Sequence, residues 1–184
     1  MYADADNNGH CGGTACGGLY LNVMQQAVYF ATLKSAYLGN KSGILAVGIN
    51  GSPALTQFQS WITAGNIKEP VTHITNTTLL QTVNFSQYKV LYIPSALVNN
   101  GGVTVNGIND AQNNVLASRK ADIANYVNNL GGSLIALGQS RLVKAYQWLP
   151  VPLQFQALDI TTVSVTPGKD SPLCCLAFSL IHSV

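Results

Sequence analysis

The chain has 184 residues, of which 47% are hydrophobic and only 9% are charged, and its formal net charge at pH 7 is +2. A chain of this length suits one domain and buries enough apolar surface to fold without a disulfide or a structural metal. Its dispersed Lys and Arg residues form no basic stripe, which argues against nucleic acid as a partner, and no apolar run approaches the roughly 20 residues of a membrane span.

Residues 1–18 are predicted to form a loop rich in Gly and Cys. Asp4, Asp6 and Asn8 alternate ahead of a Gly, as oxygen ligands do at the start of a calcium-binding loop. Ala15 occupies the twelfth loop position, where a bidentate Glu normally completes such a site. Two interpretations therefore stay open, a calcium site without its closing ligand and a solvated turn, and no other cofactor is expected.

The cysteines help to predict the cellular location of the protein. Cys11 and Cys16 enclose the flexible segment Gly-Gly-Thr-Ala and are expected to form a small disulfide. With the low charge, this short Cys loop favours a secreted or cell-surface protein. The first residues carry no signal-peptide pattern, so the protein is either cytosolic or its signal has been removed. Four N-x-Ser/Thr sequons, some of them expected by chance, give candidate glycosylation sites at Asn40, Asn50, Asn76 and Asn84.

Hydrophobic periodicity predicts alternating helices and strands over residues 19–170. In chain order we expect a helix over 19–38, a strand at Ile44–Val47, a helix from Pro53, a strand at Val71–Ile74, a brief helix over 77–83, a strand within 88–95, a loop over 96–109, a helix over 110–130, a strand at Leu134–Leu137, a short helix over 141–147 and a strand at Thr161–Val165. Residues 171–184 form an apolar tail without a clear period. This alternation predicts an α/β fold, a three-layer α/β/α sandwich around a mainly parallel central sheet.

The helix over 110–130 and the strand after it carry the clearest boundary signals. Asp110 is expected to be the N-cap of this helix, and Gly131 is expected to end it in the left-handed conformation. The run Leu134–Leu137 is continuously apolar, which is typical of a strand covered on both faces. We therefore expect this strand at the centre of the sheet.

Ligands of open parallel sheets bind at the carboxyl ends of the strands. The residues expected to line a crevice there are Asn50, Ser95, Asn99, Gln139 and Ser140. The turn over 48–52 leads into a helix N-terminus, which favours anions, but the Gly pattern and the Lys of nucleotide-binding loops are absent. His73 stands in a predicted strand with no partner nearby in the sequence, so a structural role and a catalytic role both stay open.

Over residues 43–149, the succession of strands and helices, with a long loop, a long helix and a Gly-Gly strand, resembles the flavodoxin-like core of the class I glutamine amidotransferase-like superfamily. With its Asp-Ala-Asp-Asn-Asn-Gly opening and its Cys-Gly-Gly-Thr-Ala-Cys-Gly-Gly loop, the chain also resembles uncharacterised domains of secreted bacterial proteins. The first resemblance implies a flavodoxin-like sheet and, in the enzymes of the superfamily, a Cys nucleophile at a strained elbow.

The chain departs from the enzymes of this superfamily at their catalytic positions. Aligning the last Gly of their Gly-Ile-Cys-x-Gly motif with Gly138 puts Ala136 at the nucleophile, and a methyl group cannot attack a carbonyl. Their oxyanion turn Pro-Gly-Gly reads Pro94-Ser95-Ala96 here. Their His-x-Glu dyad has no counterpart, because the chain's one Glu is Glu69 and its one late His is His182. The resemblance therefore implies a degenerate, non-catalytic member.

Three hypotheses for the function follow. The first is a non-catalytic extracellular or cell-surface module for binding or assembly, whose neutral polar surface meets glycans or copies of itself; seven scattered carboxylates disfavour a paired acid and base. The second is a hydrolase that acts from the crevice at the carboxyl ends of the strands, by analogy of fold. The third is a calcium-stabilised adhesive domain.

Overall fold

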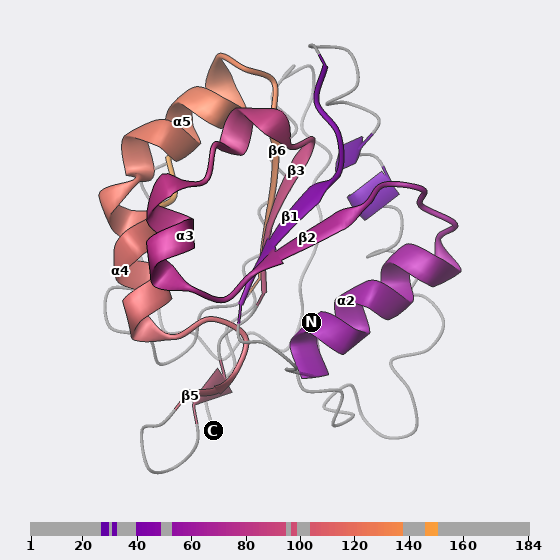
Figure 1. Ribbon diagram of the computed structural model, residues 1–184, viewed down its shortest axis with the longest axis horizontal. Coiled ribbons are helices and arrows are strands. Elements are labelled where there is room, and N and C mark those ends of the chain that lie inside the picture. Colours follow the sequence, from indigo (N-terminus) through magenta and orange to yellow (C-terminus); the bar gives the residue numbers. More distant parts are fainter. Residues whose placement is uncertain are drawn as a thin grey trace, which may run out of the picture.

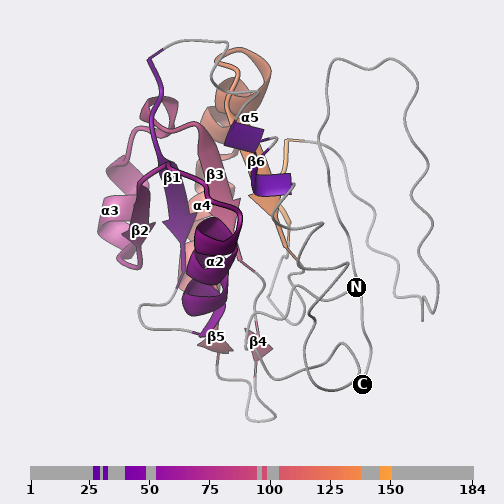
Figure 2. The same ribbon diagram turned by 90° about the vertical axis from the view of Figure 1, so that its right-hand side faces the viewer.

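The computed structural model describes residues 27–29, 31–32, 40–48, 53–94, 97–98, 104–137 and 146–150. A four-stranded parallel sheet lies at its centre, in the order β2-β1-β3-β6 (Figure 1). The strands are β1 (Ile44–Val47), β2 (Val71–Ile74), β3 (Val90–Ile93) and β6 (Ser133–Ala136). Figure 2 shows them side by side with their arrows pointing the same way.

The strand order reverses between β1 and β3, because the chain passes from β1 out to β2 and then crosses back to β3. Ile44 is paired with Val71 on one side and with Val90 on the other. The register continues into β6, where Ala136 is paired with Ile93. In open α/β sheets, the carboxyl ends of the strands at such a reversal are the usual place for a ligand.

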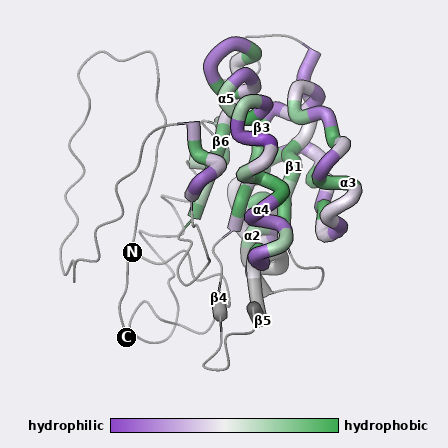
Figure 3. Tube along the Cα trace, turned by 90° about the vertical axis from the view of Figure 1, so that its left-hand side faces the viewer, coloured by the Kyte–Doolittle hydropathy of each residue, from purple (hydrophilic) through white to green (hydrophobic). Residues whose placement is uncertain are grey.

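Two apolar layers cover the sheet, because successive residues of a strand point to opposite faces. The helices are α2 (Pro53–Ala64), α3 (Thr77–Thr82), α4 (Asp110–Ser118) and α5 (Lys120–Asn128). In β1, Leu45 and Val47 pack in the layer of α3, α4 and α5, whereas Ile44 and Ala46 pack in the layer of α2. Figure 1 shows these helices on opposite sides of the sheet, and in Figure 3 the strands are hydrophobic between more polar helices.

The fold is an α/β sandwich of the flavodoxin-like kind, and the prediction of this fold class is confirmed. Strands β1 and β2 have the predicted bounds, and α2 begins at Pro53 as expected. Asn76 caps the predicted brief helix, which is α3, and Gly131 adopts a positive φ of 64° as predicted. The predictions for 1–18, 161–165 and 171–184 lie outside the described residues, as do parts of those for 19–38 and 141–147.

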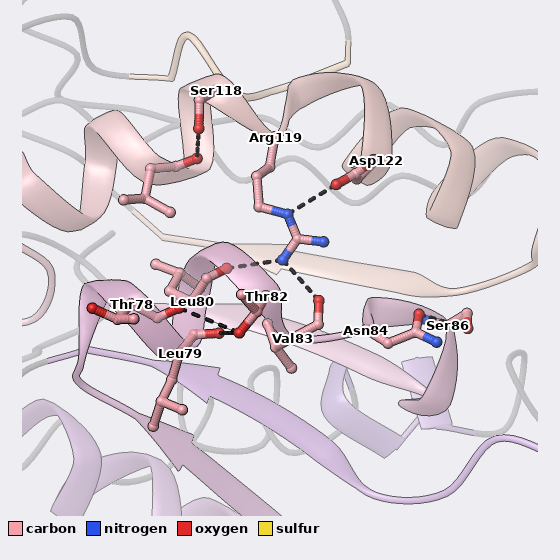
Figure 4. A network of polar contacts seen from close by, with 11 residues as sticks. Thr78, Leu79, Leu80, Thr82, Val83, Asn84, Ser86, Ser118, Arg119 and Asp122 are labelled. Carbon is pink, nitrogen blue, oxygen red and sulfur yellow. Dashed lines mark hydrogen bonds and ion pairs between the residues drawn. The ribbon is translucent and has the colours of Figure 1, made fainter.

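The predicted helix over 110–130 differs from the structure, because it is broken at Arg119 into α4 and α5. Two contacts explain the break, one within the helix and one with the end of α3. Just before it, the Ser118 hydroxyl donates to the Val115 carbonyl (2.7 Å), which competes with regular backbone pairing. Arg119 turns toward α3, where its Nη1 donates to the carbonyls of Leu80 and Val83, both at 2.8 Å (Figure 4). The cationic side chain thereby caps carbonyls at the C-terminal end of α3.

Three further sequence expectations were wrong in detail. The N-cap of α4 is Asn109, not Asp110, because the Asn109 side chain and Gln112 form a reciprocal capping box. The predicted loop over 96–109 contains a short antiparallel pair, β4 (Leu97–Val98) and β5 (Thr104–Asn106). The strand expected at the sheet centre, β6, is the outermost one within the described residues and pairs there with β3.

Candidate functional site at the carboxyl edge of the sheet

Four backbone positions mark the carboxyl edge of the sheet. Gly48, Thr75, Pro94 and Leu137 directly follow β1, β2, β3 and β6. Pairing between strands extends one residue past the strand ends, since Gly48 N donates to Ile74 O (3.1 Å) and Leu137 N donates to the carbonyl oxygen at the end of β3 (3.0 Å). Regular strand pairing therefore includes Gly48 and Leu137.

Gly48 lies at the reversal between β1 and β3 and is enclosed by its neighbours. A Cβ at this position would lie 3.3 Å from Pro94 Cγ, 3.5 Å from the Gly107 carbonyl oxygen and 3.7 Å from His73 Nε2. Gly48, Pro94 and Gly107 are buried, and Ile108 is fully buried in the core. A residue without a side chain lets these chain segments meet closely. The described residues thus fill the space above the end of β1 with protein.

Gln112 on α4 fastens the ends of β1 and β2 to this helix. Its side chain is 1% exposed, and Nε2 donates to the carbonyls of Gly48 (3.1 Å) and Thr75 (2.8 Å). Its Oε1 accepts a hydrogen bond from Asn109 N (3.0 Å), and its own N–H donates to Asn109 Oδ1 (2.9 Å). Every hydrogen-bonding group of the amide is engaged, so Gln112 has a positioning role and offers no free group to a ligand.

The next residue of α4, Asn113, holds a second buried polar contact. Its Oδ1 accepts a hydrogen bond from Trp148 Nε1 at 3.0 Å, and neither side chain has exposed surface. Tyr146 sits in the left-handed region at φ 62°, and its carbonyl accepts a hydrogen bond from Leu149 N (3.0 Å). This tight turn brings the indole of Trp148 against α4. Both amide side chains at the start of α4 therefore support the packing of the edge.

His73 is a titratable group that lies close to the end of β1. It is half-buried on β2, paired in register with Ala46, and its Nε2 faces Gly48. Burial lowers the pKa of His73 below its ordinary value of 6.5, so the imidazole is neutral at pH 7. No hydrogen bond joins the imidazole ring to another described residue. A neutral imidazole is the form that accepts a proton.

Ala136 occupies the position where the amidotransferase resemblance places the nucleophile. It lies within β6, still paired with Ile93, and its methyl group packs against the core layer of α3, α4 and α5. The strand continues its pairing through Leu137. At this position the described chain therefore has regular sheet with an inert side chain.

The predicted crevice residues lie outside the described residues. The crevice residues are Asn50, Ser95, Asn99, Gln139 and Ser140. Also outside the described residues are the predicted calcium ligands Asp4, Asp6 and Asn8, the cysteines Cys11 and Cys16, and Gly138. The sequons at Asn40, Asn76 and Asn84 are described, and all three Asn residues are exposed.

Sequence reasoning missed Gln112, Asn113 and Trp148. The spacing Asn109-x-x-Gln112 is that of a capping box and would have located the start of α4, but it does not indicate the contacts of Gln112 with Gly48 and Thr75. No local pattern indicates the contact between Asn113 and Trp148, because it joins residues 35 positions apart.

Within the part of the chain that the structure describes, no group of three or more His, Cys, Asp or Glu side chains is placed to hold a metal ion. Among the described helices, none combines the length and apolar character required to cross a membrane.

Comparison with known proteins found no match for the chain, neither a family model nor a curated protein nor a solved structure. The fold and the site geometry therefore carry the functional argument.

Proposed function

We propose that this chain is a non-catalytic extracellular or cell-surface module for binding or assembly, on an amidotransferase-like scaffold without the nucleophile. Its ligands are neutral glycans or further copies of itself, since a surface with few charges binds through neutral hydrogen-bonding groups and apolar contacts.

The state of the carboxyl edge supports this proposal most. The Gly48 position is closed by Pro94 and Gly107, the Gln112 amide is fully engaged, and Ala136 carries an inert methyl group. An acyl-transfer enzyme needs a nucleophile, a base and an oxyanion site converging on one point. The described part of this edge offers a single half-buried imidazole instead.

The test of the proposal has a catalytic arm and a binding arm. The purified full chain is treated with a fluorophosphonate probe, assayed for hydrolysis of p-nitrophenyl esters and assayed for ammonia release from glutamine. We expect background values in all three assays. In the binding arm, we expect either saturable binding on an array of neutral oligosaccharides or concentration-dependent association in sedimentation velocity. Turnover in the first arm, or no binding and no association in the second, would contradict the proposal.

The hydrolase is the alternative that a specific observation favours, namely the neutral His73 imidazole facing the end of β1. In this alternative His73 is the general base of a serine nucleophile from the predicted crevice, with Ser95 and Ser140 as its candidates. The variant His73→Ala separates the two proposals. Probe labelling that is present in the parent chain and lost in this variant would favour the hydrolase.

The calcium-stabilised adhesive domain stays a prediction from Asp4, Asp6 and Asn8. A ligand that binds the folded state raises the melting temperature. A chelator should therefore lower the melting temperature if calcium is bound, and an unchanged melt would exclude a stabilising calcium ion.

A further inference from the structure

The segment that carries α3 has no charged residue of its own, and Arg119 and Asp122 lie beside its C-terminal end. From Pro70 to Tyr88 the sequence contains no Asp, Glu, Lys or Arg. Thr78, Gln81 and Thr82 are exposed on α3, and Leu79 is 57% exposed between them. This leucine is the most exposed large hydrophobic side chain in the described part of the chain. A surface of this kind is kept in solution by hydroxyl and amide groups alone, unless something else covers it.

Asn76 stands at the N-terminal end of this surface and is the N-cap of α3. Its Oδ1 accepts hydrogen bonds from Thr78 N (2.7 Å) and Leu79 N (3.4 Å). The same Asn starts the sequon Asn76-Thr77-Thr78. Because the cap engages the oxygen, it fixes the side-chain torsion, and Nδ2 has no hydrogen-bond partner among the described residues.

Asn84 stands at the other end of α3 and repeats this arrangement. Its Oδ1 accepts hydrogen bonds from Ser86 N (3.0 Å) and Ser86 Oγ (2.8 Å), so the two polar residues of the sequon Asn84-Phe85-Ser86 contact each other. The middle residue, Phe85, is 3% exposed and lies under the Arg119 guanidinium, 3.9 Å from its carbon to the ring centroid. The buried ring anchors the turn, while Asn84 is exposed. Figure 4 shows Asn84 and Ser86 just beyond the end of α3.

We propose that Asn76 and Asn84 both carry N-linked oligosaccharides, which flank α3 and cover Leu79. The inference rests on the extracellular location in the proposed function. In both residues the amide oxygen serves the fold and the amide nitrogen is left for modification, so a sugar on Nδ2 leaves the caps intact. The two residues bracket a six-residue helix of about 9 Å. Glycans at both ends therefore overlie the uncharged surface between them, and a binding partner meets another face of the domain.

The modification is a group transfer with a defined donor. In the donor, C1 of an oligosaccharide is bonded to the diphosphate of a polyprenyl lipid. The bond between C1 and the diphosphate oxygen breaks, and the Asn Nδ2 forms a new bond to C1. Nδ2 loses one proton, and the lipid diphosphate leaves. The reaction involves neither an oxidant nor a reductant.

The closing experiment uses the full chain from the cells that produce it. The protein is treated with peptide N-glycosidase in ¹⁸O-labelled water, which converts each glycan-bearing Asn to a heavy Asp, and is then mapped by peptide mass spectrometry. We expect label at both Asn76 and Asn84. If Asn76 or Asn84 is unlabelled while Asn40 or Asn50 is labelled, the site assignment is overturned, but the proposed extracellular location still holds. No label at any of the four sequons would overturn the inference and count against the extracellular location as well.

Matched variants test the same sites in a secreting eukaryotic cell line, with a secretion signal added ahead of residue 1. Ser86→Ala and Thr78→Ala remove the sequon hydroxyls but keep both Asn caps. Ser86→Thr and Thr78→Ser are the controls, because they keep the sequons. Each Ala variant should lose the mass of one glycan, each control should lose none, and all four should melt like the parent after deglycosylation. An Ala variant of unchanged mass would exclude that Asn as an acceptor.

Discussion

The two ends of the sheet are held together by different chemistry. At the amino end, Glu69 pairs with the Lys89 ammonium and accepts a hydrogen bond from Gly43 N at 2.9 Å, so that charged groups join the starts of β1, β2 and β3. At the carboxyl end, the neutral amides of Gln112 and Asn113 tie the strand ends to α4 and to Trp148. The ionic contacts are partly exposed, whereas the amides are buried.

This difference follows from the cost of desolvation. A buried amide needs hydrogen bonds only, but a buried ion also needs a counter-charge. Water at the amino end reduces this cost for Glu69 and Lys89, and the buried carboxyl end is built without ions. In a flavodoxin-like sheet the carboxyl end is where chemistry would take place. In the described residues of this chain, that end is built for packing, and His73 is the one feature there that points to another use.

The largest effect is expected for a substitution at the carboxyl end of the sheet. Gln112→Ala should lower the free energy of unfolding by about 3–4 kcal/mol, since it removes three side-chain hydrogen bonds and leaves the buried carbonyls of Gly48 and Thr75 without a donor. Urea denaturation monitored by tryptophan fluorescence measures the loss. The exposed Gln81→Ala is the matched control and should change the value by less than about 0.5 kcal/mol.

The substitution Gln112→Glu sharpens this test, because it keeps the shape of the side chain. A carboxylate facing two carbonyls is disfavoured in the folded state, so the pKa of the new Glu would be raised above its unfolded value. The penalty should therefore be larger at pH 7 than at pH 4, where the protonated acid again donates to a carbonyl. A penalty independent of pH would show that the fit of the side chain, and not its hydrogen bonds, holds this end together.

The second test concerns packing at the amino end. Gly132 N donates to Tyr126 O at 2.8 Å, and a Cβ on Gly132 would overlap the Tyr126 ring. This ring is 1% exposed, and its hydroxyl is bonded to the carbonyls of Tyr88 (3.2 Å) and Ser133 (3.3 Å), so it cannot easily move away. Gly132→Ala should cost about 3 kcal/mol in thermal or urea unfolding.

A double-mutant cycle identifies the cause of this penalty. In the Tyr126→Leu background the ring is absent. The loss of unfolding free energy caused by Gly132→Ala should then be at least about 1 kcal/mol smaller than in the parent chain, which is the size of coupling expected for two residues in direct contact. Equal penalties in the two backgrounds would mean that backbone strain at Gly132, and not the phenol ring, is responsible.

The sequence predicted what depends on local pattern and missed what depends on distant contacts. The runs Ile44–Val47 and Val90–Ile93 are buried throughout, and their apolar character predicted a strand at each. The strand predicted to be covered on both faces, Leu134–Leu137, is only half-buried at Leu134 and Ala136. The break at Arg119 was not predictable from periodicity, because one of the two contacts behind it joins Arg119 to carbonyls at the end of α3, more than 30 residues away. Gln112 was missed for the same reason, since its partner Gly48 lies 64 positions earlier.

The candidate site stays a prediction. The rule that ligands bind at the carboxyl ends of parallel strands predicts a crevice at this edge, and the residues predicted to line it lie outside the described residues. It did not predict that Pro94 and Gly107 close over Gly48, because this closure depends on how the segment before α4 folds back over β1. The sequence places His73 in a strand, but its pairing with Ala46, which brings Nε2 close to Gly48, depends on strand register, which a single sequence does not specify.

The third test measures how much the Arg119 cation, which lies away from the strand ends, contributes to the free energy of unfolding. Arg119→Met keeps much of the side-chain volume but removes the two hydrogen bonds to α3 and the contact with Phe85. We expect a loss of about 2 kcal/mol in urea unfolding, since these are charge-assisted bonds to helix-end carbonyls. The control is Asp122→Asn, which removes only the negative charge beside Arg119 Nε (2.9 Å). Asp122 is 58% exposed, and its charge should contribute less than about 0.5 kcal/mol. Similar losses in both variants would contradict a capping role for Arg119.

The smallest expected effect concerns the ionic contact at the amino end. Burial acts to raise the pKa of Glu69, but the hydrogen bonds from Lys89 and Gly43 and the Lys89 charge outweigh it, so the pKa lies below the ordinary 4.5. A lowered folded-state pKa stabilises the protein above the unfolded pKa, and this contribution is lost as the pH falls through the folded value. Glu69→Gln should therefore cost about 1 kcal/mol at pH 7, and the difference from the parent should shrink as the pH falls below 4.5 and through the lowered folded-state pKa. A difference that stays constant from pH 7 to pH 3 would show that hydrogen bonding alone, without charge, joins the strands at this end, as it does at the other.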